Sequence, residues 1–301
     1  MSINSPTSFF SILRGGLDHF MHGTVLSPIF FGAVAFILIC ERLMPADPKQ
    51  SSWSTGFLQD GVWVALTLIF QGSVVVLYAN TITMLYKNHL SFLIWDSAKY
   101  FPESMRFILG VLAGDFLAWF QHWLKHKVPW FWEMHAVHHS QRQMNLFTDY
   151  RFHFMEYIIS KPIVLIPLMA LGVDTSTVAW WALLTTWQAR FYHANIRSNL
   201  GFLKFIFVTP QSHRVHHSIE VRHCDMNFGV IFSFWDRLFR TQYAGFEEYP
   251  DTGIRDRQFP LEKKADPISL VMVPLQQLIY PFQAIARKRA PDTNRDPDAQ
   301  S

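Results

Sequence analysis

The sequence predicts an all-α integral membrane protein with about four or five membrane helices and a helical cap on the cytosolic side of the membrane. Three observations lead to this class. Half of the 301 residues are hydrophobic and only 16% are charged, whereas soluble domains carry about 25% charged residues. Several apolar stretches have the length of a helix and no charge. Histidines cluster directly after two of these stretches, which places a polar helical region beside the membrane helices.

The first part of the chain supplies the longest apolar stretches. Residues 23–40 are uncharged and about as long as a helix that spans a bilayer. Residues 61–86 are also uncharged and are long enough for a tilted span. The segment 90–101 is expected to lie along the membrane interface. We therefore predict N-terminal membrane helices and an interfacial segment over residues 1–104.

A helical hairpin is predicted in the middle of the chain. The apolar segments 162–173 and 175–189 are short, and Gly172, Val173 and Asp174 between them indicate a turn. The hairpin returns the chain to its starting side, so the histidines before and after it meet there. Lysines and arginines flank the hairpin but are missing from its turn, which by the positive-inside rule places the histidine region in the cytosol.

Near the C-terminus, residues 267–286 are uncharged, and prolines at positions 267, 274 and 281 are expected to break any helix there. This pattern predicts a segment that lies on the membrane surface. The polar tail from Arg287 is expected to be disordered. Residues 246–301 are thus predicted as an interfacial segment and a disordered tail. The net charge of +3, without a basic stripe, favours anionic lipid headgroups over nucleic acid as a partner.

The histidines recur at short, related spacings. His122 and His126 are four residues apart and share one face of a helix. Imidazole binds Fe, Cu and Zn well, and one four-coordinate metal would not use so many rings, so two metals are predicted. The remaining members are found in HAVHH, in HRVHH and in the isolated position before the latter: His135, His138, His139, His193, His213, His216 and His217.

Three further residues are candidates for the same site. Asp115 lies on the helix face of His122, where it would either orient a ligand ring or pair with a neighbouring helix. His153 and Glu156 are three residues apart, so both are expected to face the HAVHH cluster, and His153 is predicted as a further ligand. Glu156 would be a ligand, an acceptor for a ligand ring or a proton relay, with an ion pair to Arg151 as the alternative.

The run from Asp115 to Glu156, together with FYHANI, HRVHHSIE, NFG and FWDRLFRT, resembles the fatty acid hydroxylase/sterol desaturase superfamily. The resemblance covers about residues 110–243, and RFHFME is similar to a stretch of the bacterial members. Lys127 stands where that family often has arginine, and FRT replaces the usual FGT. These departures affect the subfamily and leave the histidine pattern intact.

The resemblance implies a membrane-bound oxygenase with two iron ions, which uses O2 and external electrons to hydroxylate or desaturate an aliphatic C–H bond. Its lipid substrate would be a fatty acyl chain, a sterol or an ether lipid. Residues 105–245 would form the catalytic domain, and Glu156 and Asp115 would assist catalysis. A ferredoxin, a cytochrome or a reductase would supply the electrons, and the protein would be a multi-pass protein of the bacterial inner membrane. The resemblance assigns the metal to His122, His126, His135, His138, His139, His153, His193, His213, His216 and His217.

Two other classes of protein use clustered histidines. A zinc-dependent membrane hydrolase would carry an HExxH helix, and this spacing does not occur in the sequence. A bis-histidine haem carrier would place isolated histidines deep in facing helices, whereas these histidines are tightly clustered just past the ends of apolar stretches. Metal analysis separates iron, zinc and haem directly.

Overall fold

The computed structural model describes residues 28–85, 88–89 and 91–289. Within this part of the chain the regular elements are helices, and β-structure is limited to isolated bridges such as the one between Pro45 and Ile196. The predicted all-α class is therefore confirmed for the described residues. The first residues of the expected helix at 23–40 and the expected tail beyond residue 289 lie outside them.

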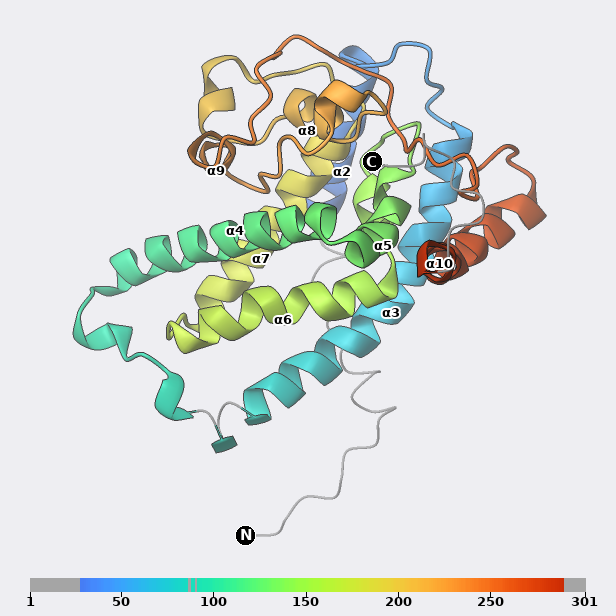
Figure 1. The fold of residues 1–301 in the computed structure, drawn as a ribbon. Helices are drawn as coiled ribbons and strands as arrows, with labels where there is room; N and C mark the ends of the chain where they lie inside the picture. Colours follow the sequence, from blue (N-terminus) through green and yellow to red (C-terminus); the bar gives the residue numbers. More distant parts are fainter. Residues whose placement is uncertain (1–27, 86–87, 90, 290–301) are drawn as a thin grey trace.

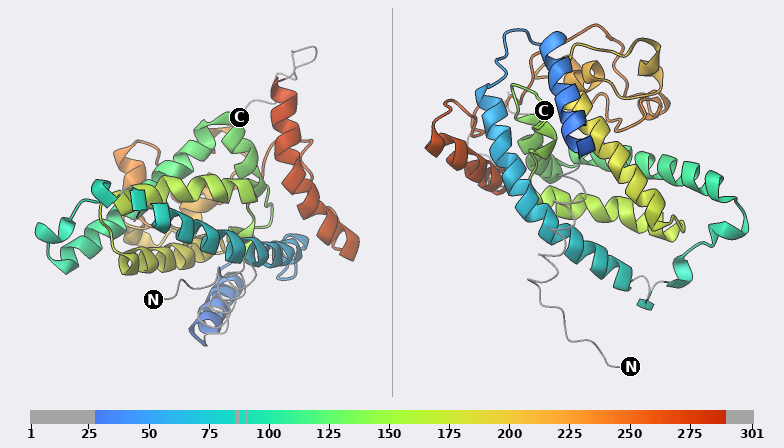
Figure 2. Two further views of the ribbon diagram at one scale, coloured as in Figure 1. Left: turned by 90° about the horizontal axis from the view of Figure 1, so that it is seen from below. Right: turned by 180° about the vertical axis from the view of Figure 1, so that it is seen from behind.

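The helices form a bundle with an irregular cap at one end (Figure 1). Helices α3, α4, α6 and α7 make the bundle, α8 and α9 belong to the cap, and α10 packs across α3 and α5. Figure 2 shows α2 lying along α7 on the far side of the view in Figure 1. The α-helices are α2 (Pro28–Leu43), α3 (Thr55–Leu85), α4 (Glu103–Lys127), α5 (Pro129–His139), α6 (Phe154–Ala170), α7 (Thr175–His193), α8 (Pro210–His216), α9 (Phe234–Leu238) and α10 (Pro267–Arg289). Short 3-10 helices occur at η3 (Ser91–Leu93), η4 (Ser97–Lys99), η5 (Thr148–Tyr150), η6 (Gly201–Phe205) and η7 (Val221–His223).

The predicted hairpin is formed by α6 and α7. Gly172 joins them at a φ of 68°, and a Cβ at this position would collide with the carbonyl oxygen of Trp95. Asp174 then caps α7 by accepting a hydrogen bond of 2.8 Å from the backbone N–H of Thr177. The start of α6 and the end of α7 consequently lie at the same end of the bundle, beside the cap.

The main hydrophobic core joins the bundle to the cap. It is built from buried side chains of α4, α6 and α7 together with two residues of the cap: Val111, Ala118, Val164, Leu168, Trp181, Val230 and Ile231. Gly114 allows α4 to approach the indole of Trp181, which a Cβ would meet at 3.0 Å. The cap is thus part of the packed body of the protein.

Among the described residues, two helices, α4 and α10, are long and apolar enough to cross a membrane. The cap covers the C-terminal half of α4, because Asp115 in its middle binds the backbone of Ile231 and Phe232. Only the N-terminal half of α4 exposes large apolar side chains, among them Phe107 and Ile108. The exposed apolar surface of α4 therefore lies at the end of this helix away from the cap.

Helix α10 is continuous, and the predicted breaks at its prolines are corrected. Pro274 has no N–H for the carbonyl of Leu270, and Gln59 of α3 donates to that carbonyl at 3.1 Å instead. The indole N–H of Trp63, also on α3, donates to the side chain of Gln277 at 3.3 Å. Contacts to α3 therefore compensate for the backbone hydrogen bond that the proline removes.

Candidate metal centre

Four helices bring the histidines to the capped end of the bundle. His122 and His126 occupy the last turns of α4, and α5 begins two residues after α4 ends, with Pro129 at its first turn. His193 is the last residue of α7. Helix α8 starts at a capping box of Thr209 and Ser212, which fixes the turn that carries the third cluster. Each cluster therefore stands at a helix end that its local sequence defines.

The nine clustered histidines form two groups, and in each group the candidate ligand atoms lie within 4.8 Å of one another. The first histidine group consists of His122, His126, His135, His139 and His216. The second histidine group consists of His138, His193, His213 and His217. All of these side chains except His126 are classed as buried, and each group draws on three helices or their ends.

In the second histidine group, ring nitrogens face each other in a way that favours a cation. Nδ1 of His138 lies 3.0 Å from the carbonyl oxygen of Arg151, and Nδ1 of His193 lies 2.8 Å from that of Ala189. Each Nδ1 must carry the proton, so both Nε2 atoms present lone pairs. These two Nε2 atoms are only 3.1 Å apart. A metal ion between them would convert a repulsive contact into two bonds.

The first histidine group shows buried nitrogens without partners. Nδ1 of His122 binds the carbonyl of Phe228 at 3.0 Å, and Nδ1 of His216 binds that of Met226 at 2.8 Å, which directs Nε2 of both rings inward. Leaving a buried polar atom unsatisfied costs about 1–3 kcal/mol. Four Nε2 atoms of this group are buried and lack hydrogen bonds, those of His126, His135, His139 and His216. The donor set fits a bound metal.

The environment keeps these rings in the form that binds metals. Burial lowers the pKa of His216 to about 4, although its hydrogen bond to Met226 opposes the shift. Burial also lowers the pKa of His135 and of His217 well below the ordinary value, with neighbouring rings adding to the effect. At neutral pH the rings are therefore uncharged and have a lone pair to offer.

Glu156 belongs to this site as a hydrogen-bond acceptor. Its Oε1 lies 3.1 Å from Nδ1 of His135 and 2.7 Å from Nζ of Lys125. The carboxylate holds the His135 ring with Nε2 toward the first histidine group. Its ion pair is made with Lys125, so the alternative pairing with Arg151 is wrong.

His153 lies outside both groups, which corrects the prediction that it joins the ligands. Its Nε2 is 2.9 Å from the carbonyl oxygen of Leu278 in α10, and its Nδ1 accepts a hydrogen bond from the backbone N–H of Met155. Both ring nitrogens are thus satisfied by the protein. His153 connects α10 to the start of α6.

The prediction that Asp115 orients a histidine is likewise corrected. Its carboxylate accepts hydrogen bonds from the backbone N–H groups of Ile231 and Phe232 and from the indole of Trp235, at 2.8 to 3.0 Å. The alternative prediction, a carboxylate paired with a neighbouring element, is closer to the structure. Asp115 fixes the cap to α4.

Sequence reasoning missed the backbone acceptors and the residue that holds one of them. Asp236 accepts hydrogen bonds from the indole of Trp119 and from the N–H groups of Phe228 and Gly229. It thereby positions the carbonyl of Phe228 that binds His122. The signal for this role is the Trp235–Asp236 pair of the FWDRLFRT run.

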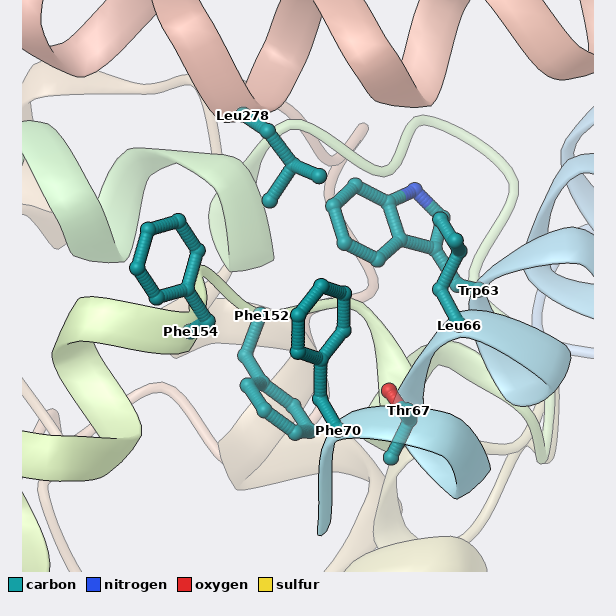
Figure 3. Close-up of a pocket in the computed structure, with 7 residues that line it drawn as sticks. All are labelled: Trp63, Leu66, Thr67, Phe70, Phe152, Phe154 and Leu278. Carbon is teal, nitrogen blue, oxygen red and sulfur yellow. The ribbon is translucent and has the colours of Figure 1, made fainter. Parts of the chain in front are cut away.

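An apolar pocket lies beside the loop that leads into α6 (Figure 3). Its walls come from α3, from the two phenylalanines that flank His153 and from α10. The lining residues are Trp63, Leu66, Thr67, Phe70, Phe152, Phe154 and Leu278. One of these lining residues, Phe152, directly follows Arg151, whose carbonyl binds His138.

Comparison with known proteins shows what the region of this site is similar to. Residues 107–241 match the family model described as fatty acid hydroxylase, and all nine clustered histidines fall within them. The chain is 27% identical to the ornithine lipid hydroxylase OlsE of Rhizobium tropici over 73% of its own length and 68% of that protein. No solved structure matches the chain.

The names of two further relatives refer to other lipids. Human alkylglycerol monooxygenase is 34% identical over 51% of this chain but only 33% of its own length. A cholesterol 25-hydroxylase-like protein of Danio rerio is 22% identical over 71% of this chain and 89% of its own length. The chain spans about a third of the length of the alkylglycerol monooxygenases that it matches. Residues 107–241 are therefore similar to the fatty acid hydroxylase family, and the names of these relatives are those of lipid hydroxylases or monooxygenases.

Proposed function

We propose that this protein is a membrane-bound di-iron hydroxylase that uses O2 and external electrons to oxygenate an aliphatic C–H bond of a lipid. The single observation that carries the proposal is the meeting of nine neutral histidines in two adjacent groups within a region similar to the fatty acid hydroxylase family. The first histidine group would hold one iron ion and the second histidine group the other. Together the ions would supply electrons to O2 and activate it toward the C–H bond.

The chain's own residues would orient and shield this centre. Backbone carbonyls and Glu156 fix the direction of at least five rings, so the metal positions are preorganised. Oε2 of Glu156 is buried and has no hydrogen-bond partner, so it could accept a hydrogen bond from a group bound beside the site. Burial of the rings excludes water from the reacting atoms.

The substrate is proposed to be a bilayer lipid with a long hydrocarbon chain. The small pocket beside Arg151 and His153 is lined mainly by apolar side chains, which supports a ligand with hydrocarbon character. Relatives named as hydroxylases and monooxygenases of ornithine lipid and alkylglycerol favour hydroxylation over desaturation. A ferredoxin, a cytochrome or a reductase would deliver the electrons.

We further propose a multi-pass arrangement in a bacterial inner membrane, with the histidine domain in the cytosol. Residues 1–104 would supply membrane helices, 105–245 the catalytic domain and 246–301 an interfacial segment and tail. The distribution of lysine and arginine around the hairpin supports this orientation, and so does the exposed apolar end of α4.

The lipid product tests this function. Lipid extracts of cells that produce the protein should contain species with one added oxygen, and growth under isotopically labelled O2 should label that oxygen. Cells producing a His138→Ala, His216→Ala double variant provide the matched control. Lipids that lose two hydrogens would indicate desaturation, and unchanged lipids in all cultures would contradict the proposal.

A further inference from the structure

A buried charged network surrounds the loop that follows α5, and the hydrogen bonds of its charged side chains go to groups other than the histidine rings. Its centre is Arg151, whose side chain is fully buried. Nε and Nη2 of Arg151 both lie 2.8 Å from Oδ1 of Asp60 on α3. Nη1 and Nη2 each lie 3.4 Å from an oxygen of Glu262, in the segment before α10. One guanidinium therefore bridges two carboxylates from opposite parts of the chain.

The second carboxylate oxygen of Asp60 accepts hydrogen bonds from other side chains of this loop. Its Oδ2 accepts hydrogen bonds from the side chains of Gln141 at 2.6 Å, Asn145 at 2.8 Å and Thr148 at 3.0 Å. Asp60 thus accepts from several donors between residues 141 and 151, and its carboxylate is completely buried. These contacts hold the loop in one conformation, because any rearrangement would leave a buried charge without its partners.

The same loop carries an atom that the second histidine group needs. The carbonyl oxygen of Arg151 accepts the Nδ1 hydrogen of His138, which directs Nε2 of that ring toward His193. Nη1 of Arg151 also donates to Oγ of Ser140, the residue directly after His139. The guanidinium and the carbonyl of one residue therefore link the charged network to the C-terminal end of the HAVHH cluster.

We propose that Asp60, Arg151 and Glu262 are positioning residues for the metal of the second histidine group. They act through the Arg151 carbonyl, which sets the tautomer and direction of His138. Asp60 and Glu262 both lie outside residues 107–241. The flanking segments thus complete a site whose ligands all lie within that range. This inference rests on the proposed function, since it concerns the metals proposed there.

Arg151→Lys is the informative variant. Lysine keeps the positive charge between the two carboxylates, so folding does not leave them unpaired, but it lacks the fork that holds Asp60, Ser140 and Glu262 together. The purified full-length protein is titrated anaerobically with Fe²⁺, and bound iron is measured by elemental analysis and Mössbauer spectroscopy. We expect the unsubstituted protein to fill both positions. In Arg151→Lys one position should weaken about 10- to 100-fold, with loss of one iron signal.

Asp115→Asn is the matched control. Asp115 is equally buried and binds three donors, but none of those donors contacts a histidine. We expect this variant to melt at a lower temperature and still bind both irons with unchanged affinities. Glu262→Gln provides a second test that does not depend on Arg151→Lys folding, and it should weaken the same iron position less strongly.

The outcomes separate the two proposals. Both irons bound with unchanged affinity in Arg151→Lys and Glu262→Gln would overturn the positioning role and leave the proposed function intact. Failure of the unsubstituted protein to bind Fe²⁺ would overturn the proposed function and this inference together. Equal weakening of both positions, matched by Asp115→Asn, would reduce the network to a general support of the fold and also overturn the inference.

Discussion

Glu156 accepts a hydrogen bond from His135 across 3.1 Å and is itself paired with Lys125. This contact connects the start of α6 to the HAVHH cluster on α5. A carboxylate on α6 therefore orients His135, which is a ring of the first histidine group. Its position between a lysine and an imidazole keeps its charge balanced while it orients His135.

Glu156→Gln should therefore weaken metal binding without unfolding the protein. The amide oxygen is a poorer acceptor for the His135 ring than a carboxylate, and Lys125 loses its counter-charge. We expect the affinity of one Fe²⁺ position to fall about tenfold. Anaerobic Fe²⁺ titration measures this change.

Glu133→Gln is the control for this substitution. Glu133 is another buried carboxylate, and it lies on α5. It pairs with Lys288 at 2.6 Å, away from the histidine rings. Its iron affinities should match those of the unsubstituted protein. Equal losses in the two variants would argue against a specific role for Glu156.

The metal-free protein should lose stability in mild acid. The pKa of His216 is about 4 in the folded chain against an ordinary value of 6.5. Between these two pH values the ring is therefore mostly protonated in the unfolded chain and mostly neutral in the folded chain. Its contribution is complete above pH 6.5 and declines by about 1.4 kcal/mol per pH unit as the pH falls toward 4. The other rings with lowered pKa values act in the same direction.

Thermal melting between pH 7 and pH 5, compared between the unsubstituted protein and the His216→Ala variant, measures the contribution of this ring. Replacement of His216 by alanine should flatten part of the slope. A melting temperature that stays constant over this range in the metal-free protein would contradict the assignment of neutral buried rings.

Asp236→Ala should destabilise the cap strongly. The substitution leaves the indole of Trp119 and the N–H groups of Phe228 and Gly229 without their acceptor. With a cost of about 1–3 kcal/mol for each unsatisfied buried group, unfolding should become easier by about 3 kcal/mol or more. Chemical denaturation in detergent tests this value, and Asp251→Ala, at an exposed carboxylate, should have little effect.

Filling the apolar pocket should impair the use of long lipid chains. Trp in place of Leu278 would occupy space between α3 and α10, and we expect KM for a long-chain lipid to rise about tenfold. Ile279→Trp is the control, because the neighbouring side chain is 55% exposed on the other face of α10. If both variants turn over the lipid with the same KM, the pocket does not hold the substrate.

The histidine pattern was predictable because ring spacing and metal preference act locally. HxxHH places its rings on adjacent turns or at a helix end, whatever the rest of the fold does. The hairpin was also predictable, since Gly172 and Asp174 mark the turn by their own conformational preferences. Sequence reasoning therefore identified the nine residues that meet, but not which rings belong to which group.

The errors in the predicted site have physical reasons. His153 and Glu156 share a helix face only if the helix includes both, and α6 begins at Phe154 with His153 in an extended N-cap conformation. Asp60 was overlooked because it stands just before the uncharged stretch 61–86, whereas α3 begins at Thr55 and runs through it. Buried charges satisfied by distant segments leave no local pattern, and any residue could have supplied the carbonyls that orient the rings.

The central claim is that the two histidine groups each hold one iron ion. Anomalous diffraction at the iron absorption edge, recorded from crystals of the iron-loaded full-length protein, tests it most directly. We expect two peaks, one among His122, His126, His135, His139 and His216 and one among His138, His193, His213 and His217. A single peak, a signal at the zinc edge alone, or no peak within either group would contradict it.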